Sequence, residues 1–345
     1  MGLRVAVTLL LLASAAACTE SPAPPPAAPN AADVAAALRA VDEHLTRSDA
    51  SSALRIAQRL ASLAPRDPLA QDALARALLA EAGQSSPGRA TELRHSAIEA
   101  YAAAAAADGF HAGYPHAASV VASMVPGGAA QALALAEEAC RRAPSDASHH
   151  LYRGLAHARL DHWEEALAAF GESDRLRPDD PTCLMSMADV SARVGRSSSA
   201  LELASRARSL RPDDQDLRLM EARVARLAGS PDRSRALLLA LDEAALARES
   251  VGIELALACQ QLGDQEGRAR AIERTAIAQP LRIDLAINTA LAWAEAGRAE
   301  EAAFWVERAR KAGAPESVLD AAHASLSEAI DRHRRGSPAP SRIEP

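Results

Sequence analysis

The sequence predicts an all-α fold, an α-solenoid of about eight helix-turn-helix hairpins followed by a C-terminal capping helix. The first observation behind this prediction is composition, because alanine and leucine dominate the 345 residues and aromatic residues make up only 3%. Alanine and leucine lose little side-chain entropy in a helix, whereas strands favour branched and aromatic residues. The second observation is a repeat: the pentapeptide LRPDD stands at residues 176–180 and again 34 positions later, at residues 210–214.

Glycine, which is scarce in this chain, keeps the same interval of 34 residues. The series is Gly195, Gly229, Gly263 and Gly297, preceded by Gly127, with Asp161 in the slot between. A glycine in the middle of a unit supplies the left-handed position that ends the first helix of a hairpin. We therefore expect a turn between two helices at each of these positions.

Proline, aspartate and alanine mark the rest of each period. They occur at Pro144, Pro178, Pro212 and Pro280, at Asp146, Asp180 and Asp214, and at Ala132, Ala166 and Ala200. Proline cannot continue a helix and closes the unit, and the aspartate two residues later is a good N-cap for the next helix. In Asp67-Pro68 and Asp180-Pro181 a proline follows the cap directly, which suits the first position of a helix. The small alanine lets the second helix lie close to the first.

A helix-turn-helix period of 34 residues resembles the tetratricopeptide repeat. The clearest copy is residues 148–178, in which the family's glycine, alanine, phenylalanine and proline positions hold Gly154, Ala166, Phe170 and Pro178. It departs from the family at His150 and His157, where large aromatic residues are usual. The resemblance implies a right-handed superhelix, and it covers nearly everything from residue 34 to residue 334.

The register of this repeat places the start of each unit. The starts are expected near Val34, Pro68, Gly113, Ala147, Pro181, Gln215, Glu249 and Ile283. The second unit is expected to carry an insertion around residues 83–94 between its helices, and the sixth is degenerate. A charged helix over residues 316–334 is expected to cap the stack, as terminal repeats must.

The N-terminal residues are predicted to lie outside the solenoid, which we place at residues 33–334. Residues 1–17 are typical of a signal peptide, because a basic residue precedes an apolar run that is too short to span a bilayer. The small residues before Cys18 resemble a bacterial lipoprotein signal, which makes Cys18 the expected site of lipidation. Ala15 stands where that signal usually has leucine, so ordinary cleavage within residues 15–17 is the alternative.

Two further segments are predicted to lack a packed core. Residues 18–32 form a Pro/Ala-rich linker that holds the solenoid away from the membrane, and residues 335–345 form a disordered tail. The protein is therefore expected to be exported. It is either a membrane-anchored lipoprotein facing the periplasm or cell surface, or a soluble periplasmic or secreted protein.

The resemblance also implies where a partner would bind. First helices line a concave groove in this family, and the register assigns groove positions to Tyr152, Arg159, Met185, Asp189, Arg193, Arg223 and Arg226, and also to Leu151, Leu155, Leu219, Ile253, Leu257, Gln260, Ile287, Asn288 and Leu291. A row of arginines among apolar side chains would suit an amphipathic or acidic peptide, because guanidinium groups pair well with carboxylates. The alternative is a solvated arginine face on an arginine-rich chain.

Four histidines and three cysteines have structural interpretations. His149, His150, His157 and His162 look like a metal cluster, but two of them fall at packing positions of the repeat, and we expect no metal site. Cys140, Cys183 and Cys259 fall in different units and are expected to be buried thiols. No catalytic motif is present, and no catalytic residue or cofactor is expected.

The function expected from these observations is a non-enzymatic scaffold or adaptor of the bacterial cell envelope that binds a partner protein in its groove. The net charge of −7 disfavours nucleic acid, which usually requires a basic surface. Two alternatives remain at this point: a metal-binding or hydrolytic enzyme that uses the histidines, and a helical-repeat RNA binder.

Overall fold

The computed structural model describes residues 30–335, without the side chains of residues 332–334, and this part of the chain contains helices and no strand. The predicted signal peptide, Cys18 and nearly all of the predicted linker and tail lie outside the described residues. No helix among the described residues is both long enough and apolar enough to cross a membrane.

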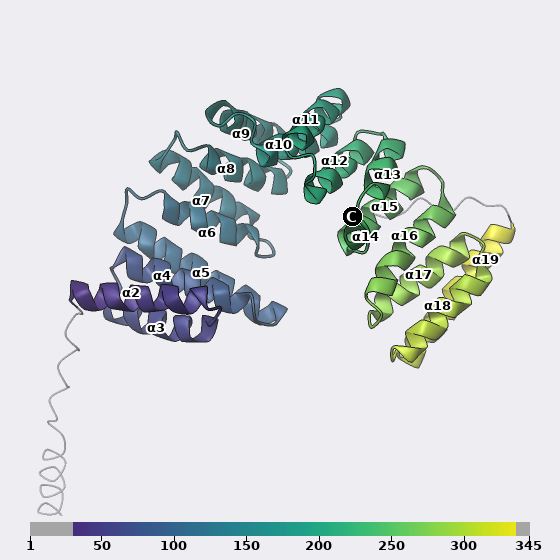
Figure 1. Ribbon diagram of the computed structural model, residues 1–345, viewed down its shortest axis with the longest axis horizontal. Coiled ribbons are helices and arrows are strands. Elements are labelled where there is room, and N and C mark those ends of the chain that lie inside the picture. Colours follow the sequence, from purple (N-terminus) through teal and green to yellow (C-terminus); the bar gives the residue numbers. More distant parts are fainter. Residues whose placement is uncertain (1–29, 336–345) are drawn as a thin grey trace, which may run out of the picture. The chain divides into compact units, whose positions relative to one another are not determined.

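The helices follow one another along the chain with short connections (Figure 1). In order they are α2 (Ala31–Thr46), α3 (Ala50–Leu63), α4 (Pro68–Ala82), α5 (Pro87–Ala107), α6 (Gly113–Ser123), α7 (Ala129–Arg142), α8 (Ala147–Arg159), α9 (Trp163–Leu176), α10 (Pro181–Arg193), α11 (Ser197–Leu210), α12 (Gln215–Leu227), α13 (Pro231–Leu239), α14 (Glu243–Leu246), α15 (Glu249–Gln261), α16 (Gln265–Ala278), α17 (Ile283–Glu295), α18 (Ala299–Lys311) and α19 (Glu316–Arg334). Successive helices pack as hairpins, and seven of the eight expected unit starts coincide with the first residue of a helix. The first unit begins slightly earlier, at Ala31, because the Asn30 side chain caps α2 by accepting the Asp33 N–H at 2.9 Å.

The chain divides into two compact units between Tyr114 and Pro115. The first contains α2–α5, and the second contains α7–α19. The candidate groove residues all belong to the second unit. That unit is therefore the one that matters for the site.

The turns within the hairpins have the left-handed backbone that the glycine series predicts. The φ angles are 74° at Gly127, 78° at Gly195, 78° at Gly229, 73° at Gly263 and 77° at Gly297. Asp161, in the slot that lacks a glycine, adopts the same conformation with φ 58°. The prediction of a turn at each slot is confirmed, including the one where a side chain must tolerate the left-handed region.

The aspartates that close each period are helix N-caps. The Asp180 side chain accepts the N–H groups of Thr182 and Cys183 at 2.8 and 3.3 Å, and Asp214 does the same for the first turn of α12. Pro181 occupies the first position of α10, where its missing N–H costs nothing. The repeated LRPDD sequence is thus a helix end followed by a helix start.

Alanines and one glycine let the two helices of a hairpin approach each other. Ala132, Ala166 and Ala200 are completely buried. A Cβ atom at Gly154 on α8 would lie 2.5 Å from the ring of Phe170 on α9, so the absence of a side chain creates the space that this ring fills. Slim helices packed this closely account for a core with so few aromatic residues.

Two units depart from the expected pattern. The predicted insertion between the helices of the second unit is wrong: Pro87 starts α5, which runs for 21 residues, so most of the extra residues lengthen the second helix. In the degenerate sixth unit, α13 has only 9 residues, and the short helix α14 follows it with Asp242 as its cap. Ser234, in the alanine slot of this unit, is completely buried.

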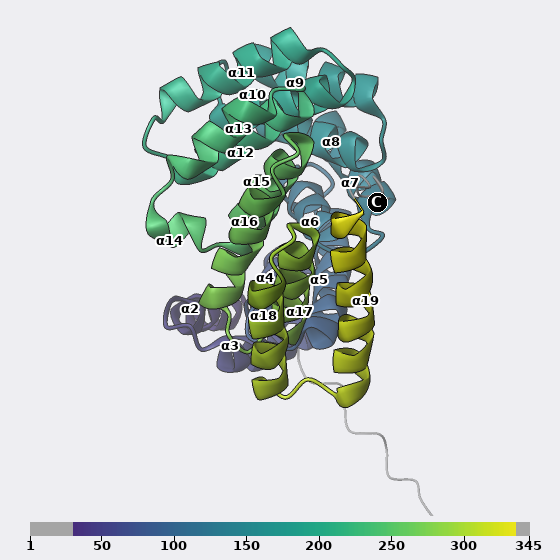
Figure 2. The same ribbon diagram turned by 90° about the vertical axis from the view of Figure 1, so that its right-hand side faces the viewer.

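The C-terminal end of the stack is built around two tryptophans. The indole N–H groups of Trp293 on α17 and Trp305 on α18 both donate to one carboxylate oxygen of Glu273 on α16, at 3.3 and 2.8 Å. Helix α19 packs against α17 and α18 (Figure 2) and buries Leu319 among them. It covers the last hairpin, as the capping helix is expected to do.

Candidate partner-binding face

The arginines assigned to the groove are engaged within the protein. Arg193 Nε and Arg223 Nε both contact the carboxylate of Asp189, at 2.8 and 3.2 Å. The Arg193 guanidinium also lies over the ring of Trp163, 5.5 Å from its centroid. Arg159 donates to the carbonyl oxygen of Ser123. The arginines of this row are therefore already engaged within the protein and are not free to bind an acidic peptide.

Arg226 is the most enclosed member of this row. Its Nε lies 2.8 Å from Glu254 Oε2, and the two side chains are only 12% and 14% exposed. The pair joins α12 to α15, which makes Arg226 a structural link between units. A partner could reach it only by breaking this pair.

Met185 and Tyr152 also differ from the expectation of open groove residues. Met185 is completely buried, because its slot points into the core between α10 and its neighbours, and the prediction that it contacts a partner directly is wrong in this structure. Tyr152 is half-buried, and its ring meets the edge of His116 with 4.9 Å between centroids. A small hollow of 190 Å³ lies beside Met185, with Asp189 and Arg223 among its lining residues.

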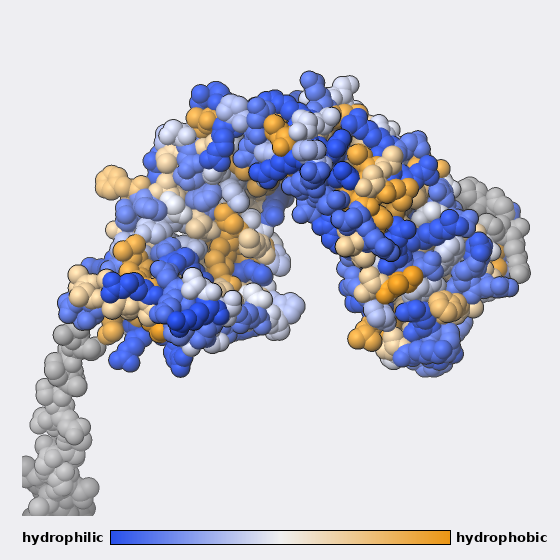
Figure 3. Space-filling model, viewed as in Figure 1, coloured by the Kyte–Doolittle hydropathy of each residue, from blue (hydrophilic) through white to orange (hydrophobic). Residues whose placement is uncertain are grey.

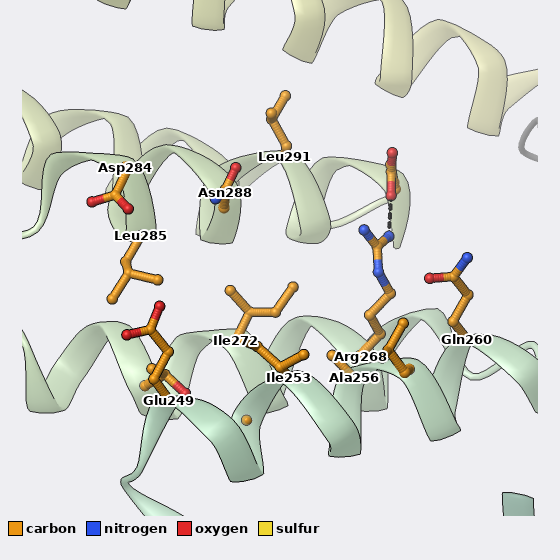
Figure 4. Close-up of a pocket in the computed structure, with 14 residues that line it drawn as sticks. Glu249, Ile253, Ala256, Gln260, Arg268, Ile272, Asp284, Leu285, Asn288 and Leu291 are labelled. Carbon is orange, nitrogen blue, oxygen red and sulfur yellow. Dashed lines mark hydrogen bonds and ion pairs between the residues drawn. The ribbon is translucent and has the colours of Figure 1, made fainter. Parts of the chain in front are cut away.

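The open apolar part of the face lies further along the chain, between α15 and α17, with α16 behind. This hollow has a volume of 390 Å³, and we call it the α15–α17 groove. Ile253 and Ile272 lie at its middle, and Leu285 lies toward one end (Figure 4). Ile253 is 52% exposed, although a large aliphatic side chain gains free energy by leaving water. Apolar surface over α13 and α15 is visible among hydrophilic surface in the space-filling view (Figure 3).

The α15–α17 groove collects groove residues that the repeat register identified from the sequence. Ile253, Leu257, Gln260, Asn288 and Leu291 all line it, whereas Ile287, which the register also assigns to the groove, packs against the core of the last units. The register missed Ile272 and Thr275, because they come from the second helix α16, which the register does not assign to the groove. Alternation of helices in the array is the only sequence signal that could have found them.

Charged residues stand at both ends of the α15–α17 groove. At one end Arg268 pairs with Glu295. At the other end Arg282 is shared between two carboxylates: it holds Asp284 at 2.6 Å and approaches Glu249 at 3.4 Å. The hydrogen bond from Arg282 lowers the pKa of Asp284 to about 2. Asp284 is therefore ionised at neutral pH, and the guanidinium of Arg282 lies between it and Glu249.

Two of the four histidines lie in packing positions, whereas His157 is half-buried and His162 is exposed in the turn before α9. His149 and His150 are buried, and their ring nitrogens contact the carbonyl oxygens of Ala143 and Pro144 at 3.3 and 2.8 Å. His157 and His162 have ring centroids 5.8 Å apart. Within residues 30–335 no group of three or more His, Cys, Asp or Glu side chains is arranged to hold a metal ion.

The described cysteines are buried free thiols. Cys140, Cys183 and Cys259 form no disulfide with one another, and burial raises the pKa of each. For Cys183 the pKa rises to about 11. Thiols with these pKa values are poor nucleophiles at neutral pH, and their environment is that of core residues.

Comparison with known proteins identifies the fold. No protein-family model matches the chain, and no curated protein matches its sequence. Among solved structures, a tetratricopeptide repeat protein from Parabacteroides merdae superposes with a TM-score of 0.50 at 14% identity, over 73% of this chain and 98% of that one. PilW, a widely conserved type IV pilus biogenesis factor, gives a TM-score of 0.53 at 15% identity, over 65% and 99%. Yeast Tom70 gives 0.51 at 15% identity, over 83% of this chain and 59% of that one.

These likenesses and the helical hairpins of residues 30–335 establish a tetratricopeptide-repeat fold, as the 34-residue period predicts. At these identities they concern the fold alone.

Proposed function

We propose that this chain is a non-enzymatic scaffold of the bacterial cell envelope that holds a segment of a partner protein in the α15–α17 groove. The observation that carries the proposal is the exposed apolar floor of this groove, with Ile253 half exposed at its centre. A small apolar hollow rimmed by polar groups is the usual setting of the residues that dominate a protein interface. Elsewhere on the same face Arg193 and Arg223 pair with Asp189, and Arg226 pairs with Glu254.

Asn288 adds a polar contact within this apolar setting. It is exposed on α17, beside the aliphatic side chains of the groove (Figure 4). An amide side chain can both donate to and accept from the backbone of a bound segment. The groove thus combines an apolar anchor site with a group that could orient a peptide.

The groove can be tested by crosslinked pull-down from the native envelope. Ile253→Ser is expected to lose the partner, because burial of one aliphatic side chain contributes about 1.5–3 kcal/mol. Ile277→Ser is the matched control, since Ile277 is 58% exposed on α16 but does not line the groove. Retention of the partner by both variants would move the site away from α15–α17.

The arginine row is the rival site on the same face. The triple variant Arg159→Gln/Arg193→Gln/Arg223→Gln is expected to retain the partner once its helicity is checked by circular dichroism. Loss of the partner in this variant, with retention in Ile253→Ser, would restore the arginine row as the binding site.

The envelope location rests on residues 1–18, and we propose that Cys18 is lipidated. Cells fed a labelled fatty acid are expected to incorporate label into the wild-type protein but not into Cys18→Ser. The wild type should sediment with membranes. Soluble, unlabelled protein in both cases would contradict lipidation and favour ordinary cleavage within residues 15–17.

A further inference from the structure

We infer that the segment held in the α15–α17 groove carries an aliphatic side chain next to a lysine or arginine, so that the groove selects an apolar–basic segment and rejects an acidic one. This inference rests on the proposed function and adds the chemical class of the partner. The expected charge of the partner is thus the reverse of the one predicted from the arginine row in the sequence, which favours an acidic peptide.

The charges of the groove determine this polarity. Its lining contains three carboxylates, on Glu249, Asp284 and Glu295, and one guanidinium, on Arg268. Arg268 and Glu295 are each about three-quarters buried and pair with each other, so this end is locally neutral. The opposite end keeps two carboxylates for the single guanidinium of Arg282, and its formal charge is negative.

Glu249 is the carboxylate that can still pair with a cation of the bound segment. Arg282 forms a bidentate contact with Asp284, Nε to Oδ1 at 2.8 Å and Nη2 to Oδ2 at 2.6 Å. Its remaining contact with Glu249 is 3.4 Å long and involves only one carboxylate oxygen. The neighbouring cation Arg248 pairs with Asp216 on α12, which precedes α15 in the chain, and forms no ion pair with Glu249 among the described residues. A lysine or arginine of a bound segment can therefore approach Glu249 without displacing Arg282 from Asp284.

Helix N-termini would ordinarily favour an anionic partner at this place. Glu249 and Asp284 stand in the first turns of α15 and α17, where the positive ends of the helix dipoles lie. These two carboxylates already occupy the favourable position for negative charge. An acidic segment would add a third negative charge to the same end.

The apolar half of the recognition lies directly beside this charged end. Figure 4 shows Glu249 and Asp284 at one end of the α15–α17 groove with Leu285 between them, and Ile272 and Ile253 next to them toward its middle. A side chain that covers Ile253 would be followed along the segment by one that reaches Glu249. The two contacts together specify an aliphatic residue with a basic neighbour.

Selection of a random 12-residue peptide library on the full-length protein tests this inference. Peptides retained by the wild type and not by Ile253→Ser should share an aliphatic residue with lysine or arginine close to it. A selected peptide should bind Ile253→Ser about tenfold or more weakly. It should bind Glu249→Gln about two- to fivefold more weakly, as expected for an exposed ion pair, and this difference should shrink at high salt.

Two matched variants control these measurements. Ile277→Ser removes an equally exposed isoleucine outside the groove, and Glu300→Gln removes an exposed carboxylate from the first turn of another helix, α18. Both should bind the peptide as the wild type does. A charge swap gives the sharpest result: Glu249→Lys should reject the peptide and accept its lysine-to-glutamate counterpart.

The outcomes separate this inference from the proposed function. Peptides that need Ile253 but show no basic preference, or an acidic one, would overturn the inference and leave the groove as a binding site. Peptides that bind Ile253→Ser and the wild type equally, or a library that yields no binder, would also overturn the inference. The pull-down with Ile253→Ser and Ile277→Ser then decides on the groove itself.

Discussion

One slot of the repeat carries an ion pair in one part of the solenoid and leucines in another. Residues 189, 223, 257 and 291 stand 34 apart, and they are Asp189, Arg223, Leu257 and Leu291. The first two contact each other at 3.2 Å. The last two line the α15–α17 groove. The same backbone geometry thus gives two different surfaces. Between α10 and α12 the charged side chains pair with each other, and between α15 and α17 apolar side chains remain open to a partner.

The difference shows that the repeat register places a side chain on the groove but does not make it available. A guanidinium beside a carboxylate from the adjacent unit has its partner already, and exposed pairs of this kind contribute little to stability. An aliphatic side chain beside another aliphatic one still gains free energy when a partner covers it. Availability for binding therefore follows the chemistry of adjacent units rather than the presence of arginine.

The largest effect is expected where internal pairing is most buried. Glu221 on α12 is only 1% exposed and pairs with Arg208 and Arg233. Arg208→Ala/Arg233→Ala leaves this carboxylate buried without a cation, and we expect it to lower the free energy of unfolding by about 3–5 kcal/mol. Urea unfolding followed by circular dichroism measures the loss. An unchanged midpoint would show that the ion pairs of Glu221 with Arg208 and Arg233 do not stabilise the fold.

A matched control for this variant is Arg206→Ala. Arg206 pairs with Asp179 at the surface, 2.5 Å between Nη2 and Oδ1, with both side chains about half exposed. Its removal is expected to leave the unfolding midpoint unchanged. A comparable loss in Arg206→Ala would mean that burial is not what distinguishes the two sets of pairs.

The next effect concerns packing in the clearest repeat. Gly154→Ala places a methyl group against the Phe170 ring, so we expect the free energy of unfolding to fall by about 1–3 kcal/mol. Gly171→Ala on the adjacent helix α9 is the control, because nothing lies within 4 Å of its added Cβ atom. That substitution should stabilise by up to about 1 kcal/mol, since alanine favours helix over glycine. Equal effects in differential scanning calorimetry would contradict the close approach of α8 and α9.

Exchanging the residue types at positions 189, 223, 257 and 291 tests whether they account for the difference between the two regions. Leu257→Asp/Leu291→Arg places the residue types of Asp189 and Arg223 at the corresponding positions of the α15–α17 groove. We expect the variant to remain helical and to bind a partner segment about tenfold or more weakly, because the apolar floor is lost. Asp189→Leu/Arg223→Leu, the reverse exchange, should leave binding at the α15–α17 groove unchanged. Full binding by the first variant would contradict the role of the leucine pair.

The smallest effect is a difference in pH dependence between two other parts of the chain, the helices around the histidines, α6–α9, and the helices α10–α18, which carry no histidine. Burial and neighbouring histidines lower the pKa of His116 and of His157 from 6.5, whereas residues 163–322 contain no histidine. A base whose folded-state pKa is lowered must stay neutral to keep the fold. Its contribution to stability is therefore present above pH 6.5 and is lost as the pH falls through 6.5 toward the folded-state pKa.

Tryptophan fluorescence can report on each part separately. Trp163 lies near the histidines, and Trp293 and Trp305 lie near the C-terminal cap. Between pH 7.5 and pH 5 we expect the urea midpoint reported by Trp163, in Trp293→Phe/Trp305→Phe, to fall. The midpoint reported by the other two, in Trp163→Phe, should move less. Parallel shifts would show that the histidines do not distinguish the two parts.

The sequence predicted the architecture well because its signals are local. A left-handed glycine, an aspartate cap and a proline at the start of a helix act within a few residues, so Gly195, Asp180 and Pro181 could be interpreted without any tertiary contact. The length of α5 was not predictable in the same way. A segment rich in Gly, Ser and Pro at 83–88 reads as a loop, and only the residues after it continue as helix.

The repeat register identified several residues that line the α15–α17 groove, but it did not predict how the charged residues of this face pair. The repeat register found Ile253, Leu257 and Asn288 in the groove, since it depends only on spacing. It could not show that Asp189 would bind two arginines, one of them from the adjacent unit, because that depends on side-chain geometry between helices. For the same reason Met185 was assigned to the surface, although its slot faces the core.

Photocrosslinking from position 288 tests the central claim most directly. A benzophenone amino acid in place of Asn288 should crosslink to the partner segment, and Ile253→Ser in the same chain should abolish the adduct. The same probe in place of Arg193, between α10 and α12 where the charged residues pair with each other, should give little adduct. A strong adduct at 193 with none at 288 would contradict the account and place the partner on the arginine row.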